Sequence, residues 1–233
     1  MKTTLKVIAA TALFAGLHSV LASRRAKRLT TRLIGERNRN GLYRVAYIGQ
    51  SAISFAALVR YMRQQPDVIL YDLKGSSAWP FRATQAVGLA LAAVAAGEVG
   101  YRRISGIESF SQWQREGEVE PEPEAQGPAV AEHGMQAVGL FRLSRHPLNF
   151  WPLLVLWFNP RMTATLAAFN AAATVYLVIG LAHEELRLRA AYGTPYKNYQ
   201  QSQVPFYMPR LIHLLASSVP SMSGRLAKQI DDA

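Results

Sequence analysis

Apolar runs that are nearly free of charge alternate along this chain with polar, strongly charged segments. Helices of about 20 such residues cross a hydrocarbon core of about 30 Å at a rise of about 1.5 Å per residue. The pattern predicts an all-α polytopic membrane protein with about five transmembrane helices. These are expected over about Leu5–Leu21, Leu42–Tyr61, Phe81–Tyr101, Pro147–Phe158 and Thr163–Ala182.

The run that starts at Pro147 is too short for a full crossing, since its roughly 12 residues cover about 18 Å as a helix. Two explanations stay open at this point. Either the turn at Asn159-Pro160-Arg161 lies within the membrane, or the helix begins before Pro147.

Basic residues set the expected orientation. The first run could be a secretory signal, but the Arg and Lys cluster that follows Ala22 is typical of a helix that is retained in the membrane. We therefore expect the basic loop between the first two helices to be cytoplasmic. The N-terminus would then lie outside, and the C-terminus in the cytoplasm, of a multi-pass protein of the inner membrane.

Composition narrows the classes of function. Half of the residues are hydrophobic, yet the formal net charge is +11, so apolar and basic residues are segregated as in proteins that contact membrane lipids. A nucleic-acid-binding protein would instead interleave basic and aromatic residues, so no nucleic-acid partner is expected. The chain has no cysteine, which excludes disulfides, thiolate metal sites and a cysteine nucleophile. No metal site is predicted.

The runs and their connections divide the chain into four parts. Residues 1–116 hold the first three helices, and residues 117–134 form a Pro/Glu-rich segment that is typical of a flexible linker. Residues 135–210 hold the last helical hairpin and a C-terminal segment that we expect to cover it. Residues 211–233 are a tail.

Two titratable clusters flank that last hairpin, Ser144–Pro147 before it and His183–Leu186 after it. A hairpin that leaves one face of the membrane and returns to it brings both clusters to the same depth. Pro147 suits the first turn of a helix, so His146 is predicted at the helix start, where free N–H groups attract a carboxylate or phosphate. Arg145 adds a planar donor for such a group, although anchoring to lipid headgroups is an alternative.

The acidic pair Glu184 and Glu185 lies at the end of a long apolar helix, where carboxylates are unfavourable without partners. Ordinary surface pairs with Arg187 and Arg189, at i,i+3 and i,i+4, are one explanation. A site that binds a ligand is the other.

The segment after this helix has the pattern of a second, ordered helix. Gly193 can end the long helix, Thr194 can cap the next one, and Tyr196 and Tyr199 then share a face. Earlier in the chain, His18 interrupts the first apolar run. Helix contact and a site role remain equally open for His18, because a histidine inside a membrane is costly unless it is paired.

Taken in order, these motifs resemble the isoprenylcysteine carboxyl methyltransferase-like membrane methyltransferases, and the first half resembles their bacterial branch of methanethiol S-methyltransferases and NnrU-like proteins. The resemblance covers most of the chain outside the linker and the last 20 or so residues. Asn149 and Tyr192 depart from the family's pattern, which commonly has an aromatic residue and Phe there. The matching motifs are Arg145-His146-Pro147-Leu148, Glu184-Glu185-Leu186-Arg187-Leu188, Tyr192-Gly193-x-x-Tyr196-x-x-Tyr199, Val204-Pro205 with Pro209, His18-Ser19, Tyr43-Arg44-x-x-Tyr47 and Asp67-Val68-x-Leu70-Tyr71-Asp72.

The resemblance implies a cytoplasm-facing pocket for S-adenosylmethionine and a small or lipophilic acceptor, such as a thiol, that enters from the bilayer. The cofactor's carboxylate suits an arginine and a helix N-terminus, and its ammonium suits a glutamate. The implied catalytic residues are His146, Glu184 and Glu185. The implied cofactor contacts are Arg145, His146, Pro147, Glu184, Tyr196 and Tyr199. The alternative is a non-catalytic NnrU-like protein of nitrogen-oxide respiration, in which the same polar cluster is structural.

Overall fold

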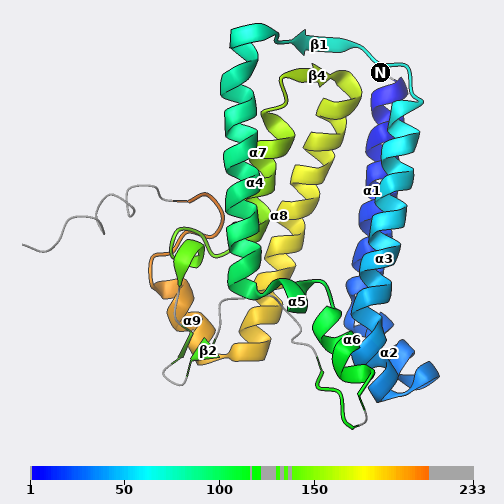
Figure 1. Ribbon diagram of the computed structural model, residues 1–233, viewed down its shortest axis with the longest axis vertical. Helices are drawn as coiled ribbons and strands as arrows, with labels where there is room; N and C mark the ends of the chain where they lie inside the picture. Colours follow the sequence, from blue (N-terminus) through cyan, green and yellow to red (C-terminus); the bar gives the residue numbers. More distant parts are fainter. Residues whose placement is uncertain (1, 116, 122–129, 132–133, 136–137, 210–233) are drawn as a thin grey trace, which may run out of the picture.

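The computed structural model describes residues 2–115, 117–121, 130–131, 134–135 and 138–209. Five apolar helices run alternately in opposite directions between two ends of the molecule (Figure 1). The first helix packs against the second and the last of these, and the third packs along the fourth. They are α1 (Lys2–Ala22), α3 (Glu36–Arg63), α4 (Trp79–Val99), α7 (Pro147–Trp157) and α8 (Ala164–Tyr192).

The helices fit a membrane protein. Among the described residues, three helices are long and apolar enough to cross a bilayer, namely α1, α3 and α8. The 21-residue α4 is not one of these, and it carries charges at Arg82 and Glu98. The apolar α7 is short. The total of five crossings and the cytoplasmic C-terminus therefore stay predictions.

The short fourth run begins at its proline. Because α7 starts at Pro147, with His146 in the N-cap position, the explanation that the helix begins earlier is wrong. After α7 ends at Trp157, the strand β4 (Arg161–Thr163) pairs antiparallel with β1 (Ile69–Asp72). The all-α expectation thus holds for the framework but missed this small sheet, which joins the two halves at the end of the molecule that contains the N-terminus (Figure 1).

The basic segment after α1 is a helix rather than the expected loop. The helix α2 (Arg24–Ile34) is capped by the hydroxyl of Ser23, which accepts a hydrogen bond from the backbone N–H of Ala26 at 3.2 Å. Its apolar residues Leu29 and Leu33 are exposed. Such a helix, with basic and apolar sides, suits a membrane interface.

Short elements complete the end that carries α2. They are α5 (Tyr101–Ile104), α6 (Ile107–Trp113), the 3-10 helix η2 (Gly139–Arg142), the strands β2 (Val130–Ala131) and β3 (Gly134–Met135), and α9 (Thr194–Gln201). A further 3-10 helix, η1 (Gly75–Ala78), lies at the opposite end, between β1 and the start of α4.

Part of the predicted linker packs against α3. The guanidinium of Arg37 donates hydrogen bonds to the carbonyls of Trp113 and Gly117, and the amide of Asn40 donates one to the carbonyl of Val119. Glycine is required at Gly41, because a Cβ there would overlap the side chain of Trp113. Residues 122–129 of the linker and the predicted tail lie outside the described residues.

Two buried clusters hold the site in place. Val7, Leu58, Ala168 and Phe169 join α1, α3 and α8. Leu188, Tyr196 and Tyr199 join α8 to α9. Between helices in a membrane, such clusters stabilise the contact through van der Waals packing. The first turns of α8 are therefore fixed against α1 and α3, and its last turns against α9.

Candidate functional site

The Ser144–Pro147 corner is held by the C-terminal strip 204–209. The backbone N–H of Arg145 donates to the carbonyl of Pro205 at 2.9 Å, and the hydroxyl of Ser144 donates to the carbonyl of Tyr207 at 2.8 Å. The same hydroxyl accepts a hydrogen bond from the N–H of His146 at 3.1 Å. These bonds fix the direction in which the Arg145 and His146 side chains leave the corner.

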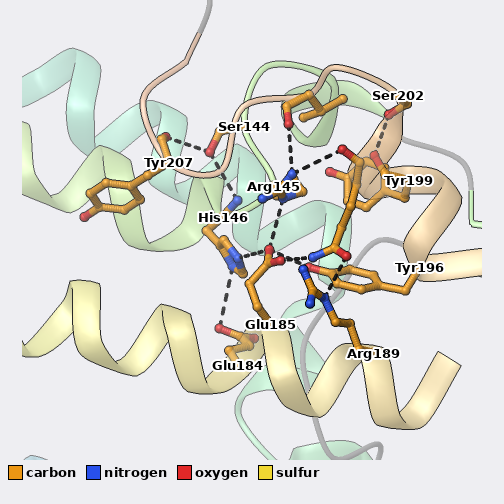
Figure 2. A network of polar contacts seen from close by, with 12 residues as sticks. Ser144, Arg145, His146, Glu184, Glu185, Arg189, Tyr196, Tyr199, Ser202 and Tyr207 are labelled. Atoms are coloured by element: carbon orange, nitrogen blue, oxygen red, sulfur yellow. Dashed lines mark hydrogen bonds and ion pairs between the residues drawn. The ribbon is translucent and has the colours of Figure 1, made fainter. Parts of the chain in front are cut away.

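Both side chains converge on Glu185, which is buried (Figure 2). Its Oε1 atom accepts hydrogen bonds from Arg145 Nε at 3.0 Å and from the Tyr196 hydroxyl at 2.7 Å, and it lies 2.9 Å from His146 Nε2. The side-chain amide of Gln200 donates to Oε2. A buried carboxylate needs this many partners, because an unpaired charge is strongly destabilising.

The surface-pair explanation is therefore wrong for Glu185. Its ionic partner is Arg145, which lies forty positions away in the sequence. Arg189, the local candidate, donates instead to Gln200 Oε1 at 2.8 Å. The predicted cap of α9 is also wrong, because Gly193 takes the N-cap position and Thr194 is the first helical residue.

Tyrosine hydroxyls act as donors around this network. Burial raises the pKa of Tyr196 and of Tyr199 well above the ordinary value of 10, so both stay protonated at physiological pH. Tyr199 donates to the carbonyl of Phe141 at 2.7 Å. Burial also raises the pKa of Tyr207 to about 12, and its hydroxyl donates to the carbonyl of Asn149 at 3.1 Å.

Glu184 approaches the same histidine from the other side. Its Oε2 atom lies 3.7 Å from His146 Nδ1, so the imidazole stands between the two glutamates (Figure 2). The ring of Phe206 stands nearly perpendicular to the His146 imidazole, with 5.4 Å between the two ring centroids, and the Arg145 guanidinium lies 5.6 Å from the centroid of the same Phe206 ring. The two clusters that flank the hairpin thus meet at one end of the molecule.

A cavity of about 850 Å³ adjoins this network between α1, α3, the start of α7 and α8. Its volume is within the range of ligand pockets, roughly 300–1,000 Å³. Of the predicted site residues, Glu184 lines the cavity. The others stand behind it: Arg145, His146, Pro147, Glu185, Tyr196 and Tyr199 are not in its lining.

Sequence reasoning missed Arg187 as a site residue. Arg187 lines the cavity one turn after Glu184, and its Nε atom is buried without a hydrogen-bond partner among the described residues. A buried unsatisfied donor is costly, which is an argument for a ligand that accepts from it. The i,i+3 spacing was the available signal, since it places both side chains on one face of α8.

Two glycines widen the cavity. Gly16 on α1 and Gly180 on α8 line it, and a Cβ added at either position would meet no atom within 4 Å. Packing therefore does not require glycine at these positions, although glycine in a helix interior costs roughly 0.5–1 kcal/mol relative to alanine. A larger side chain at Gly16 or Gly180 would therefore project into the cavity without displacing a neighbouring residue.

Comparisons with known proteins agree with the motifs. The chain is 26% identical over 197 residues to the methanethiol S-methyltransferase of Mycobacterium tuberculosis, which covers 84% of this chain and 74% of that protein. It is 26% identical over 190 residues to methanethiol S-methyltransferase 1 of Bradyrhizobium diazoefficiens, covering 82% of this chain and 61% of that protein.

A shorter match has a higher sequence identity. Methanethiol S-methyltransferase 2 of Bradyrhizobium diazoefficiens is 40% identical over 72 residues, which are 31% of this chain and span about a quarter (27%) of that protein's length. No family model matches the chain, and no solved structure is significantly similar to it. The predicted resemblance to the methanethiol S-methyltransferase branch is confirmed, and each of these relatives is named as a methyltransferase.

Proposed function

We propose that this chain, which resembles methanethiol S-methyltransferases over most of its length, transfers the methyl group of S-adenosylmethionine to a small or lipophilic thiol. The observation that carries this proposal is the pair Glu184 and Arg187 on the cavity wall, directly beside the buried Arg145–His146–Glu185 network. The amino-acid end of S-adenosylmethionine bears one ammonium and one carboxylate, and this wall of the cavity offers one charged partner for each.

Glu184 and Arg187 would hold the cofactor's amino-acid end. The glutamate suits the ammonium, and the unsatisfied Nε of Arg187 suits the carboxylate. When bound, the cofactor supplies an electrophilic methyl group on a sulfonium. The protein's contribution to such a displacement is mainly to position the two reactants and exclude water.

The predicted residues behind the wall act through Glu184 in this proposal. His146 lies between the two glutamates, so it fixes Glu184 while Arg145 and Tyr196 hold His146 through Glu185. Direct contact of Arg145, Tyr196 or Tyr199 with the cofactor would require these side chains to leave the contacts described above, and Pro147 does not line the cavity. We therefore assign them a positioning role, on the cytoplasmic side of the inner membrane.

Titration calorimetry of the detergent-purified protein with S-adenosylmethionine tests the proposal. Gly180→Leu should abolish binding, because the new side chain projects into the cavity, while the melting temperature stays near that of the wild type. Gly49→Leu is the matched control: a Cβ at Gly49 also meets no atom within 4 Å, but Gly49 does not line the cavity. Absence of binding to the wild type at millimolar cofactor would overturn the proposal.

A further inference from the structure

A second group of polar side chains lines the cavity at a different place, among apolar helices. His18 and Ser19 come from α1, Tyr47 from α3 and Tyr176 from α8. Tyr176 lies eight residues before Glu184 on α8, which is about 12 Å along the helix axis. The cavity therefore has a charged region near Glu184 and a separate region of hydroxyl and imidazole groups.

The members of this second group are hydrogen-bonded in pairs. The Tyr47 hydroxyl lies 2.5 Å from His18 Nε2, and His18 Nδ1 lies 3.0 Å from the Ser51 hydroxyl. Ser19 Oγ lies 3.0 Å from the Tyr176 hydroxyl. Both ring nitrogens of His18 are thus partnered, which accounts for a histidine inside an apolar run.

The tautomer of His18 decides what the pair can do. In one neutral tautomer Nδ1 carries the proton and donates a hydrogen bond to the Ser51 hydroxyl, and Nε2 accepts a hydrogen bond from the Tyr47 hydroxyl. The phenolic oxygen then retains lone pairs that can accept a proton from a molecule in the cavity. A proton taken up by Tyr47 can be matched by transfer of its own proton to Nε2, because the two atoms are already in hydrogen-bond contact.

Interhelical adhesion alone explains these contacts less well. Polar pairs that only join membrane helices are expected within the helix contact, whereas His18, Ser19, Tyr47 and Tyr176 all line an open cavity. Apolar and small residues surround them, among them Ala15, Gly16, Leu177 and Gly180. Such a lining admits a small apolar molecule with one protic group.

We propose that His18 and Tyr47 form the acceptor subsite of this cavity, where they bind and deprotonate a small neutral thiol. This inference rests on the function proposed above. The sulfur's proton passes to the Tyr47 oxygen as the Tyr47 proton passes to His18 Nε2. The sulfur then forms a bond to the methyl carbon as the bond between that carbon and the sulfonium sulfur breaks. The products are a methyl thioether and S-adenosylhomocysteine, and the proton on His18 is released to water.

The test compares two acceptors that differ in ionisation. Ethanethiol is mostly protonated at neutral pH and needs a base, whereas thiophenol is largely ionised and does not. Tyr47→Phe should leave the affinity for S-adenosylmethionine unchanged, lower the turnover of ethanethiol at least tenfold, and lower that of thiophenol much less. Because a base matters less as the free thiol ionises, the loss with ethanethiol should shrink as the pH rises.

Tyr43→Phe is the matched control, because Tyr43 lies one turn earlier on α3, donates to the carbonyl of Leu21 at 2.5 Å and does not line the cavity. It should leave both acceptors unaffected. Equal losses of Tyr47→Phe with the two thiols, or no loss with either, would overturn the inference.

A binding measurement on the wild-type protein avoids any effect of Tyr47→Phe on folding. The wild-type protein, alone and saturated with S-adenosylhomocysteine, is titrated with ethanethiol, and saturable binding is expected in the saturated protein. Failure of ethanethiol to bind while the cofactor product binds would overturn the acceptor subsite alone. Failure of both cofactor and product to bind would remove the proposed function, and the subsite with it.

Discussion

Glu184 and Glu185 are neighbours in the sequence but have different surroundings. Consecutive side chains on a helix point about 100° apart, so Glu185 faces the buried corner at Arg145 while Glu184 faces the cavity. Glu184→Gln should therefore weaken S-adenosylmethionine binding about tenfold or more, about 1.4 kcal/mol, with little change in stability. Glu185→Gln should instead lower stability by about 3 kcal/mol, because it breaks a buried ion pair.

Calorimetry and thermal melting of the two variants separate these effects. Tyr192→Phe serves as a control for the adjacent surface, since the described residues provide no hydrogen bond to its hydroxyl. A Glu184→Gln protein that binds the cofactor as tightly as the wild type would remove Glu184 from the site. Unchanged melting of Glu185→Gln would contradict its structural role.

At the residue scale, the sequence predicted a contact correctly where the helical hairpin supplied a long-range constraint. The hairpin predicted that Ser144–Pro147 and His183–Leu186 meet, and His146 lies 3.7 Å from Glu184. The sequence did not identify the partner of Glu185, because the i,i+4 spacing offered Arg189 and carried no information about a residue forty positions away. Arg187 was treated as a surface partner for the same reason.

At the scale of the elements, the segment that follows α3 contacts the first turn of α8, and this contact should make the stability of the protein depend on pH. Asp67 accepts hydrogen bonds from the backbone N–H of Thr165 at 3.0 Å and from the Thr165 hydroxyl, at the first turn of α8. Partial burial alone would raise the pKa of Asp67, but hydrogen bonds from Thr163 and Thr165 lower it below its ordinary value of 3.8. The carboxylate therefore stabilises the fold fully above that value, and the contribution is lost as the pH falls below it.

Asp67→Asn should lower the melting temperature at neutral pH, by the equivalent of about 1 kcal/mol or less because the site is solvent-screened. The difference from the wild type should shrink as the pH falls below about 4. Asp72→Asn is the control at the same end, where Asp72 pairs with the exposed Lys74 at 3.7 Å. A melting difference that is constant across this pH range would contradict the assignment.

The elements that the sequence predicted are those with long, continuous signals. The apolar runs located both ends of α1 and α4 to within about three residues, but α3 begins at Glu36 rather than Leu42 and α8 continues to Tyr192 rather than ending at Ala182. The helix α2 was taken as a loop because its charge dominated, although Leu29 and Leu33 recur at helical spacing. The strands β1 and β4 have four and three residues, too few for an alternating pattern to be distinguished from chance.

At the scale of the whole molecule, the cavity takes its polar side chains from helices of both halves of the chain. The N-terminal half supplies His18 and Tyr47, and the C-terminal half supplies Tyr176, Glu184 and Arg187. The contact between α1 and α8, fixed by the buried cluster around Val7 and Phe169, therefore forms the cavity. A protein of either half alone would lack one wall of the site.

The number of crossings decides on which side of the membrane α6 lies. If all five apolar helices cross, α6 is cytoplasmic, on the same side as α2 and the start of α3, against which it packs. If only α1, α3 and α8 crossed, α6 would share the outer side with η1 and would lose this contact with the start of α3. The chain has no native cysteine, so single introduced cysteines report unambiguously. The exposed positions Ser76 in η1, Glu108 in α6 and Lys197 in α9 are suitable.

In intact spheroplasts, a membrane-impermeant maleimide should label Ser76→Cys but neither Glu108→Cys nor Lys197→Cys, and permeabilisation should expose all three. Ser76→Cys and Lys197→Cys give the same result for three or five crossings and so control for orientation and membrane integrity. Labelling of Glu108→Cys from outside would mean that α4 and α7 do not cross. Because His146 directly precedes α7 and Glu184 follows the apolar part of α8, that result would also require the cavity's depth in the bilayer to be reassigned.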